Sequence, residues 1–384
     1  MAAARGQIFL HVGMPKTGTT FLQATCQASQ QQLLSQGVEF LPATRREASW
    51  LSLTVLDQLD AERDPAAALT MWDRFVAAAR ASRAPRLLVS DELLGGATEE
   101  QLRRLTRAVP GREVHLVLTI RGLAKLLPST WQQRIQQGSE APALDDFVEQ
   151  IAGRTGPIAE RWWRERGVGP VIERWSAEVP PERIHVVIMP RPGAGGSTLL
   201  ERYCGVLGVR ADDLVTDHGD RNPALGRAQA ELLRLVKEQV PDELMDRHGY
   251  VPVGKWWLAR QHLAPQGGTP PRMPARFRDW CETEARATIA SLRASGVDVV
   301  GDPDDLLPDP TDFDDGVAPT EAELLAAAVR ALASIGVQRV EEQAARRAAQ
   351  PPASRRARLR RRAGRVGRVG RELAHRSGLR RRRR

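Results

Sequence analysis

The sequence predicts an α/β fold of three layers, with a central parallel sheet between two layers of helices. Two observations support this prediction. Short aliphatic and β-branched runs, such as "RLLVS" at 86–90 and "EVHLVLTI" at 113–120, recur along the chain. Longer segments with helical periodicity separate them. Apolar strands alternating with helices are typical of a parallel sheet that is covered on both faces.

The individual elements follow from the same patterns. The run "QIFLHVG" predicts a first strand at 7–13, and a helix is expected at 19–36 with its stop at Gly37. Further helices are expected at 65–82, from Thr98, within 121–138 and within 196–208, and a further strand at 183–189. Residues 220–293 read as mostly helical, with an interruption at 265–274.

The C-terminal part of the sequence changes character twice. The acidic, proline-rich stretch "GDPDDLLPDPTDFDDG" at 301–316 marks either the end of the main domain or a linker, and a helix is expected at 320–349. Beyond it the chain is mostly arginine, alanine and glycine, a composition that predicts disorder. We therefore predict a main α/β domain at 1–315, a C-terminal helical segment at 316–350 and a disordered basic tail at 351–384.

The net charge of +9 is unevenly distributed over the 384 residues. Residues 345–384 contain 17 arginines and one acid, Glu372, which leaves about −7 for the rest of the chain. The basic tail predicts nonspecific contact with polyanions or anionic membranes, since it lacks the aromatic residues of a base-reading surface. No run of eighteen apolar residues predicts a transmembrane helix. Three widely spaced cysteines fit a reducing compartment, so we expect a cytoplasmic protein.

The stretch "GMPKTGTT" at 13–20 lies between the first strand and the first helix. A glycine turn at this position directs backbone N–H groups and the positive end of a helix dipole toward a phosphate. The loop of ATP- and GTP-binding proteins reads GxxxxGK[ST], with its lysine late and a hydroxyl reserved for magnesium. Here Lys16 comes before the second glycine, and two threonines close the loop. The fold is therefore expected to be P-loop-like, with an anion other than a magnesium-bound triphosphate.

This loop resembles the 5'-phosphosulfate-binding loop of sulfotransferases that use 3'-phosphoadenosine 5'-phosphosulfate (PAPS). The family pattern is close to GxPKTGTT, and every fixed position matches. The resemblance covers roughly residues 5 to 305. It implies that PAPS is the co-substrate, that no metal is required, and that Lys16 stabilises the leaving oxygen. The implied binding residues are Gly13, Pro15, Lys16, Thr17, Gly18, Thr19 and Thr20.

A second motif fits the separate 3'-phosphate of PAPS. In the family that the loop resembles, an arginine at the end of a later strand and a serine eight residues on bind this phosphate. Arg121 follows the strand "EVHLVLTI", and Ser129 stands eight positions later. Arginine suits the role because its planar guanidinium can meet two phosphate oxygens. Pro128 precedes the serine, and a proline there is expected to bend or begin a helix.

A general base is expected at the end of the second buried strand. "LLVSDELLGG" places Asp91 and Glu92 where ligands collect in open α/β sheets. Bacterial and heparan-type sulfotransferases have a similarly placed glutamate, so the resemblance implies Glu92 as the base, with Asp91 second. The alternative is that both acids cap the following helix. His11, His115 and His185 lie within apolar strands and are assigned to the core or a strand face.

Taken together, these motifs predict a sulfotransferase that moves a sulfuryl group from PAPS to a hydroxyl or amine of a small-molecule or glycan acceptor. Two alternatives stay open. One is a P-loop kinase using ATP and magnesium, although the late lysine is missing and only "LLVSDE" imitates a magnesium-binding strand. The other is a polyanion-binding protein that acts through its basic tail. The acceptor pocket carries no readable pattern, so the sequence does not name the acceptor.

Overall fold

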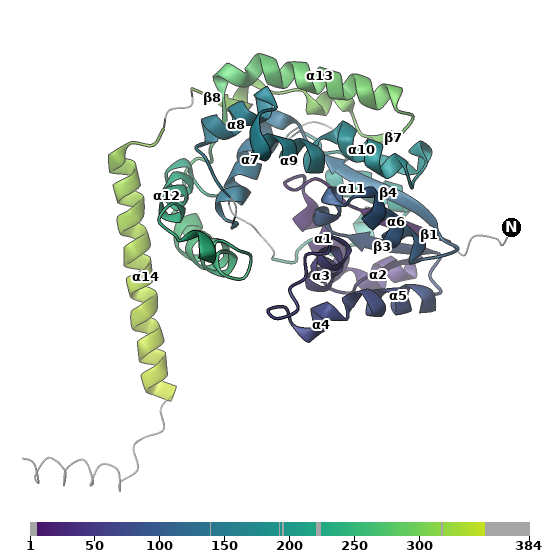
Figure 1. The fold of residues 1–384 in the computed structure, drawn as a ribbon, viewed down its shortest axis with the longest axis horizontal. Helices are drawn as coiled ribbons and strands as arrows, with labels where there is room; N and C mark the ends of the chain where they lie inside the picture. The colour runs from purple at the N-terminus through teal and green to yellow at the C-terminus, as the bar shows by residue number, and fades with distance from the viewer. Residues whose placement is uncertain are drawn as a thin grey trace, which may run out of the picture. The chain divides into compact units, whose positions relative to one another are not determined.

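The computed structural model describes residues 6–138, 140–191, 193, 196–219, 224–315 and 318–349. The predicted disordered tail at 351–384 lies outside these residues. The chain divides into two compact units after Ala328. The first unit contains all the strands (Figure 1). The predicted domain boundaries at 315 and 350 stay predictions.

The first unit is built on a six-stranded, wholly parallel sheet with the order β2-β3-β1-β4-β5-β7. Its strands are β1 (Gln7–His11), β2 (Val38–Phe40), β3 (Arg86–Ser90), β4 (Glu113–Ile120), β5 (Ile184–Ile188) and β7 (Asp298–Val300). A separate parallel pair joins β6 (Met273–Pro274) to β8 (Phe313–Asp314). Because β1 lies between β3 and β4, the three strands end along one edge of the sheet.

Alternate residues of the strands face two different hydrophobic layers. Ile8 and Leu10 of β1 belong to one core, which also receives side chains from α3, α5, α6, α10 and α13. Phe9 belongs to the other, with side chains from α1, α2 and α11. The four strands β1, β3, β4 and β5 contribute buried side chains to both layers, which explains their apolar sequences. The predicted three-layer α/β fold with a central parallel sheet is confirmed.

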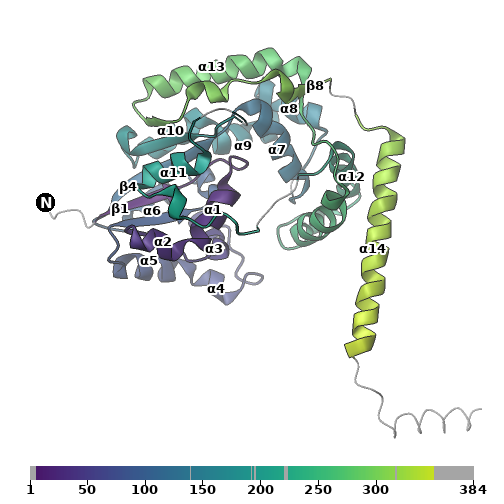
Figure 2. The ribbon, with the colours of Figure 1, turned by 180° about the vertical axis from the view of Figure 1, so that it is seen from behind.

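Some of the helices lie at opposite ends of the sheet. In both views α7, α8, α9 and α13 lie together at one end, and α2, α4 and α5 lie at the other (Figures 1 and 2). Their bounds are α1 (Thr19–Ala28), α2 (Gln30–Ser35), α3 (Arg45–Val55), α4 (Ala66–Leu69), α5 (Met71–Ala81), α6 (Glu99–Arg107), α7 (Leu123–Ile135), α8 (Leu144–Gly153), α9 (Gly156–Arg166), α10 (Val168–Ser176), α11 (Leu199–Leu207), α12 (Arg227–Lys237), α13 (Arg278–Ala294) and α14 (Glu321–Ala349).

Shorter helical turns complete the chain. They are η1 (Glu92–Gly96), η2 (Pro181–Arg183), η3 (Ala211–Asp213), η4 (Asp242–Leu244), η6 (Ala264–Gln266), η7 (Ala275–Phe277), η8 (Pro303–Leu306) and η9 (Pro310–Asp312), all of the 3₁₀ type. The segment η5 (Pro252–Leu263) has π-helical hydrogen bonding. Among the described residues, no helix combines the length and the apolar character that crossing a membrane requires.

The structure differs from the predicted elements at several points. The helix expected at 19–36 breaks at Ser29, whose buried hydroxyl accepts a hydrogen bond from the Val215 backbone N–H at 2.8 Å. The helix expected at 65–82 breaks at Thr70 into α4 and α5. Strands β2 and β7 were not predicted, because three residues are too few to show a strand pattern.

The described part of the acidic segment, residues 301–315, is packed within the first unit. Leu306, Asp312 and Phe313 are buried. Asp305 forms an ion pair with Arg202 at 3.0 Å, and both side chains are 8% exposed. The segment's carboxylates are therefore part of the fold, which its composition alone does not reveal.

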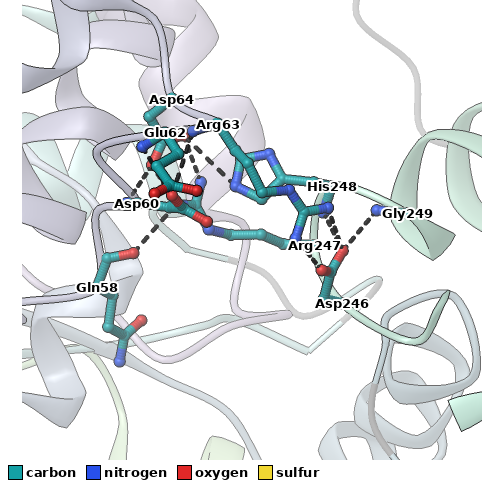
Figure 3. A network of polar contacts seen from close by, with 9 residues as sticks. All are labelled: Gln58, Asp60, Glu62, Arg63, Asp64, Asp246, Arg247, His248 and Gly249. Carbon is teal, nitrogen blue, oxygen red and sulfur yellow. Dashed lines mark hydrogen bonds and ion pairs between the residues drawn. The ribbon is translucent and has the colours of Figure 1, made fainter. Parts of the chain in front are cut away.

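A polar network, here called the clasp, ties the loop after α3 to residues 246–249, which lead into η5 (Figure 3). Arg63 contacts both carboxylate oxygens of Asp246, and Arg247 contacts both oxygens of Asp64. Asp246 also accepts the backbone N–H groups of His248 at 2.8 Å and Gly249 at 2.6 Å. The hydrogen bond from Arg247 lowers the pKa of Asp64 to about 2. These contacts fix the start of the segment that carries Lys255.

Candidate functional site

A cavity of about 700 Å³ opens at the edge of the sheet where β1, β3 and β4 end. Ligands bind at this edge in open α/β sheets because the strands end in loops there. Seven of the predicted site residues line the cavity: Lys16, Gly18, Thr19, Thr20, Glu92, Arg121 and Ser129. Three others, Gly13, Pro15 and Thr17, are buried in the loop and do not line it. The fold thus brings together residues that are far apart in the sequence.

The first part of the loop is held by β4. The Met14 N–H donates to the Thr119 carbonyl at 3.0 Å, continuing the ladder of β1. The Thr17 hydroxyl donates to the Met14 carbonyl and lies 2.7 Å from the Thr119 hydroxyl. Thr17 is fully buried, so its hydroxyl shapes the loop from inside. Its predicted contact with a ligand can therefore come only from its backbone.

Two glycines are required by close packing. A Cβ on Gly13 would lie 2.2 Å from the Thr119 Oγ1. Gly18 has a φ of +88°, and a Cβ there would lie 2.3 Å from a Leu199 methyl carbon. Gly18 is the residue before α1, and as a glycine it has no side chain that could cap the helix N-terminus. The N–H groups of the first turn of α1 therefore stay available to an anion.

Lys16 adopts an unusual backbone conformation for a residue with a side chain. Its φ of +72° lies in the left-handed region, which costs a non-glycine residue about 1–2 kcal/mol. Such strain persists where the surrounding structure imposes it and is common at ligand sites. The conformation sets the lysine side chain against the cavity.

The electrostatic surroundings of Lys16 are unfavourable for its charge. Burial is the main reason that its pKa falls to about 8, and the nearby cation Lys255 lowers it further. The nearby Glu92 carboxylate raises the pKa of Lys16, and the Arg166 guanidinium lowers it. Within the described residues, Lys16 has no ion pair. A negatively charged ligand in the cavity would stabilise the charged form.

Arg121 and Ser129 face the same cavity from α7 and the turn before it. The Arg121 Nη1 donates to the Lys16 carbonyl at 3.3 Å, so the two predicted anion-binding residues are neighbours. Burial lowers the pKa of Arg121, and Asp312 partly opposes this. Helix α7 is continuous from Leu123 to Ile135, so Pro128 lies inside it and does not begin it. The Ser129 hydroxyl donates to the Lys125 carbonyl at 2.9 Å.

The two acids after β3 have different environments. Glu92 lines the cavity, and its carboxylate accepts a hydrogen bond from the Gln23 amide at 3.0 Å. Asp91 is buried and accepts the Leu93 N–H at 2.9 Å, so it caps η1. Burial, with the neighbouring Glu92 charge, raises the pKa of Asp91. Asp91 is therefore the acid that caps η1, and Glu92 is the acid that lines the cavity.

The strand histidines lie in the sheet, away from the cavity lining. His11 is buried and hydrogen-bonded to the Ser90 hydroxyl at 2.7 Å, and burial lowers its pKa to about 3. His115 and His185 are 2.9 Å apart, with stacked rings. The two rings thus connect the neighbouring strands β4 and β5.

Several cavity residues were not predicted from the sequence. Lys255 comes from η5, Arg272 from the segment before β6, Gln132 and Gln133 from α7, and Gln136 directly follows α7. Lys125 and Asp312 also line the cavity and form an ion pair at 3.2 Å. The spacing of these three glutamines is the one sequence pattern that indicates a shared surface, because residues three and four apart lie on the same helix face.

The residues present can hold an anion by backbone N–H groups, Lys16 and Arg121. In the part of the chain that the structure describes, no group of three His, Cys, Asp or Glu side chains could hold a metal ion.

Comparisons with known proteins found a similarity in structure and none in sequence. No family model matches the chain, and no curated protein is similar to it in sequence. Among solved structures, the crystal structure of a sulfotransferase from Alicyclobacillus acidocaldarius is similar in fold. The alignment has 17% identity and a TM-score of 0.34, and it covers 58% of this chain and 88% of that one. A TM-score this low carries no argument about activity.

Proposed function

We propose that this chain is a sulfotransferase that moves a sulfuryl group from PAPS to a hydroxyl or amine of an acceptor. The observation that carries the proposal is the meeting of three sequence-distant elements at one cavity. These are the loop around Lys16, the strand-end Arg121 with Ser129, and Glu92. PAPS carries charge at two separate places, and the cavity offers two separate sets of anion-binding groups.

The loop is assigned to the 5'-phosphosulfate. Thr19 and Thr20, in the first turn of α1, line the cavity, and backbone N–H groups at a helix N-terminus favour an anion. Lys16 is placed to stabilise the charge that develops on the bridging phosphate oxygen as the sulfur–oxygen bond breaks. Arg121 and Ser129 are assigned to the 3'-phosphate, where a guanidinium can bind two oxygens.

Glu92 is assigned as the general base. It takes the proton from the acceptor hydroxyl or amine while the acceptor atom forms its bond to sulfur. The hydrogen bond from Gln23 holds the carboxylate in place, and Lys255 adds a positive charge nearby. Lys16 also interacts electrostatically with this carboxylate, so the assigned base lies between two cationic side chains.

The test is calorimetric titration with 3'-phosphoadenosine 5'-phosphate (PAP), with ATP plus magnesium as the control ligand. We expect PAP to bind more tightly than ATP, because only PAP has a 3'-phosphate. Arg121→Ala should weaken PAP binding about tenfold or more, since a charge-assisted hydrogen-bond pair is lost. Tighter binding of ATP, or PAP binding unaffected by Arg121→Ala, would refute the proposal and favour a kinase.

A further inference from the structure

A second, smaller cavity of about 50 Å³ lies between α7 and α9. It is lined by Thr130, Gln133 and Arg134 from α7 and by Arg161, Trp162 and Arg166 from α9, among others. Gln133 lines both this cavity and the large one, so the two are neighbours. This volume accommodates a few waters or one small charged group.

The positive charge around this cavity exceeds the negative charge. Glu165 is the single acid in its lining, and it forms an ion pair with Arg161 at 2.8 Å. Arg164, which does not line the cavity, also forms an ion pair with Glu165 at 3.4 Å. Arg134, which does line it, donates its Nε–H to the Glu140 carbonyl. Among the described residues, none forms a hydrogen bond or ion pair with the Arg166 guanidinium. Arg166 therefore has no direct polar contact with these residues, and Glu165 is the foremost nearby charge that favours its charged form.

Neutral side chains at the same cavity also lack partners. The Thr130 hydroxyl and the Trp162 indole nitrogen make no hydrogen bond, and these residues are only 1% and 4% exposed. An indole N–H can only donate, and a hydroxyl can donate. The Gln133 amide oxygen is also unpartnered. Buried donors without acceptors are uncommon in folded proteins and call for an explanation.

Helix electrostatics explains only part of this arrangement. Arg164 and Arg166 stand in the last turn of α9, where positive charge favours the helix dipole. That accounts for cations at this helix end. It does not account for the unpartnered polar groups of Thr130 and Trp162, two buried residues that line the cavity.

We propose that this cavity is a subsite for an oxyanion of the acceptor, so that the acceptor is an acidic molecule carrying a carboxylate, phosphate or sulfate group. An oxyanion accepts hydrogen bonds from several donors at once and neutralises the excess charge. Its position beside the large cavity places the rest of the acceptor near Glu92. The assignment to an acceptor rests on the proposed sulfotransferase function, whereas the anion site itself does not.

Arg166 links the subsite to the reacting groups. Burial lowers its pKa to about 10, and Glu92 is one of the charges that act in the opposite direction. The same guanidinium contributes to lowering the pKa of Lys16. An anion at the subsite therefore also offsets the positive charge that Arg166 places near Lys16.

The test is a titration of the PAP-saturated protein with inorganic phosphate and, separately, with acetate, with glycerol as a neutral control. We expect at least one anion to bind at one site per chain. Arg166→Gln should raise its dissociation constant about tenfold or more, because a hydrogen-bonding charge is lost. Arg161→Gln, at an exposed position, should act in the same direction without a risk to folding. The stronger of the two anions indicates a tetrahedral or a planar acceptor group.

Arg164→Gln is the matched control, because Arg164 pairs with the same Glu165 but does not line the cavity. The proposal is overturned if neither anion binds, or if Arg164→Gln weakens binding as much as Arg166→Gln. If PAP does not bind the unsubstituted protein, the sulfotransferase proposal fails instead. Phosphate titration of Lys16→Ala with and without Arg166→Gln then tests the subsite alone.

Discussion

The cations of the clasp are paired with carboxylates, whereas Lys16 and Arg166 at the two cavities form no ion pair with any described residue. In the clasp, Arg63 and Arg247 each contact both oxygens of a carboxylate. At the cavities, Lys16 and Arg166 face other cations, and their pKa values are lowered by burial. Paired charges tie segments of the chain together, while unpaired buried charges cost free energy unless a ligand supplies the counter-charge. The comparison separates structural cations from candidate binding cations without reference to any relative.

The largest effect is expected from Lys16→Ala. Losing a cation at a developing negative charge should lower turnover about 10²–10³-fold. Stability should change little, because no ion pair is broken and a buried charge is removed. The measurement is PAPS-dependent sulfuryl transfer together with the free energy of unfolding from chemical denaturation.

Lys125→Ala is the matched substitution, since Lys125 lines the same cavity but is paired with the buried Asp312. It should lose more stability and less turnover than Lys16→Ala, because an unpaired buried carboxylate remains. If both variants lose stability equally, the distinction between paired and unpaired cations is wrong for this cavity.

The next effect separates the two acids after β3. Glu92→Gln should lower turnover about 10²-fold, as expected for the loss of a general base, with PAP affinity unchanged. Asp91→Asn should act mainly on stability, because Asp91 caps η1. Sulfuryl transfer and denaturation of the two variants give the comparison. Full turnover by Glu92→Gln would remove the base assignment and leave the donor site untouched.

A smaller effect is expected in the clasp. The Asp64 side chain is 3% exposed, and Arg247 is 35% exposed. Asp64→Asn should therefore destabilise the protein by about 1–3 kcal/mol, the cost of a partly solvated pair losing one charge. Glu62→Gln, an exposed change in the same loop, is the control. A loss no larger than that of the control would show that the clasp is merely a surface contact.

The pH dependence of this loss has a definite sign. The folded pKa of Asp64 is about 2, below its ordinary value of 3.8. The ionised pair therefore contributes fully above about pH 4, and the contribution disappears as the pH falls through about 2. The stability difference between the unsubstituted chain and Asp64→Asn should shrink over the same interval. An unchanged difference at pH 2 would argue against an ionic contribution.

The sequence predicted those parts of the molecule whose structure depends on residues close together along the chain. Strands β3 and β4 have local patterns because each buries a run of apolar side chains, and the loop at 13–20 has a local motif. Lys255 and Asp312 reach the cavity only through η5 and the acidic segment, whose placement depends on tertiary contacts. The subsite between α7 and α9 was not predicted either, since it consists of side chains from two helices that look like ordinary surface helices in sequence.

The last expected effect concerns the protonation of Lys16 when PAP binds. Its pKa of about 8 in the free protein lies below the ordinary 10.5, so part of the protein has a neutral lysine above pH 8. The phosphates of PAP favour the charged form, and binding must therefore take up a proton at high pH. PAP affinity should be constant below pH 7 and fall up to about tenfold for each unit above pH 8.

Calorimetry in two buffers with different ionisation enthalpies measures this proton uptake directly. Lys16→Met should abolish it. Lys237→Met is the control, because burial also lowers the pKa of Lys237 to about 8, but its ammonium binds the Arg134 and Gln137 carbonyls outside the large cavity. Lys255→Met measures how much of the proton uptake comes from Lys255, because burial also lowers the pKa of this second cavity lysine. Proton uptake that persists in Lys16→Met would mean that another group carries the charge, and Lys16 would lose its assigned place beside the bridging oxygen.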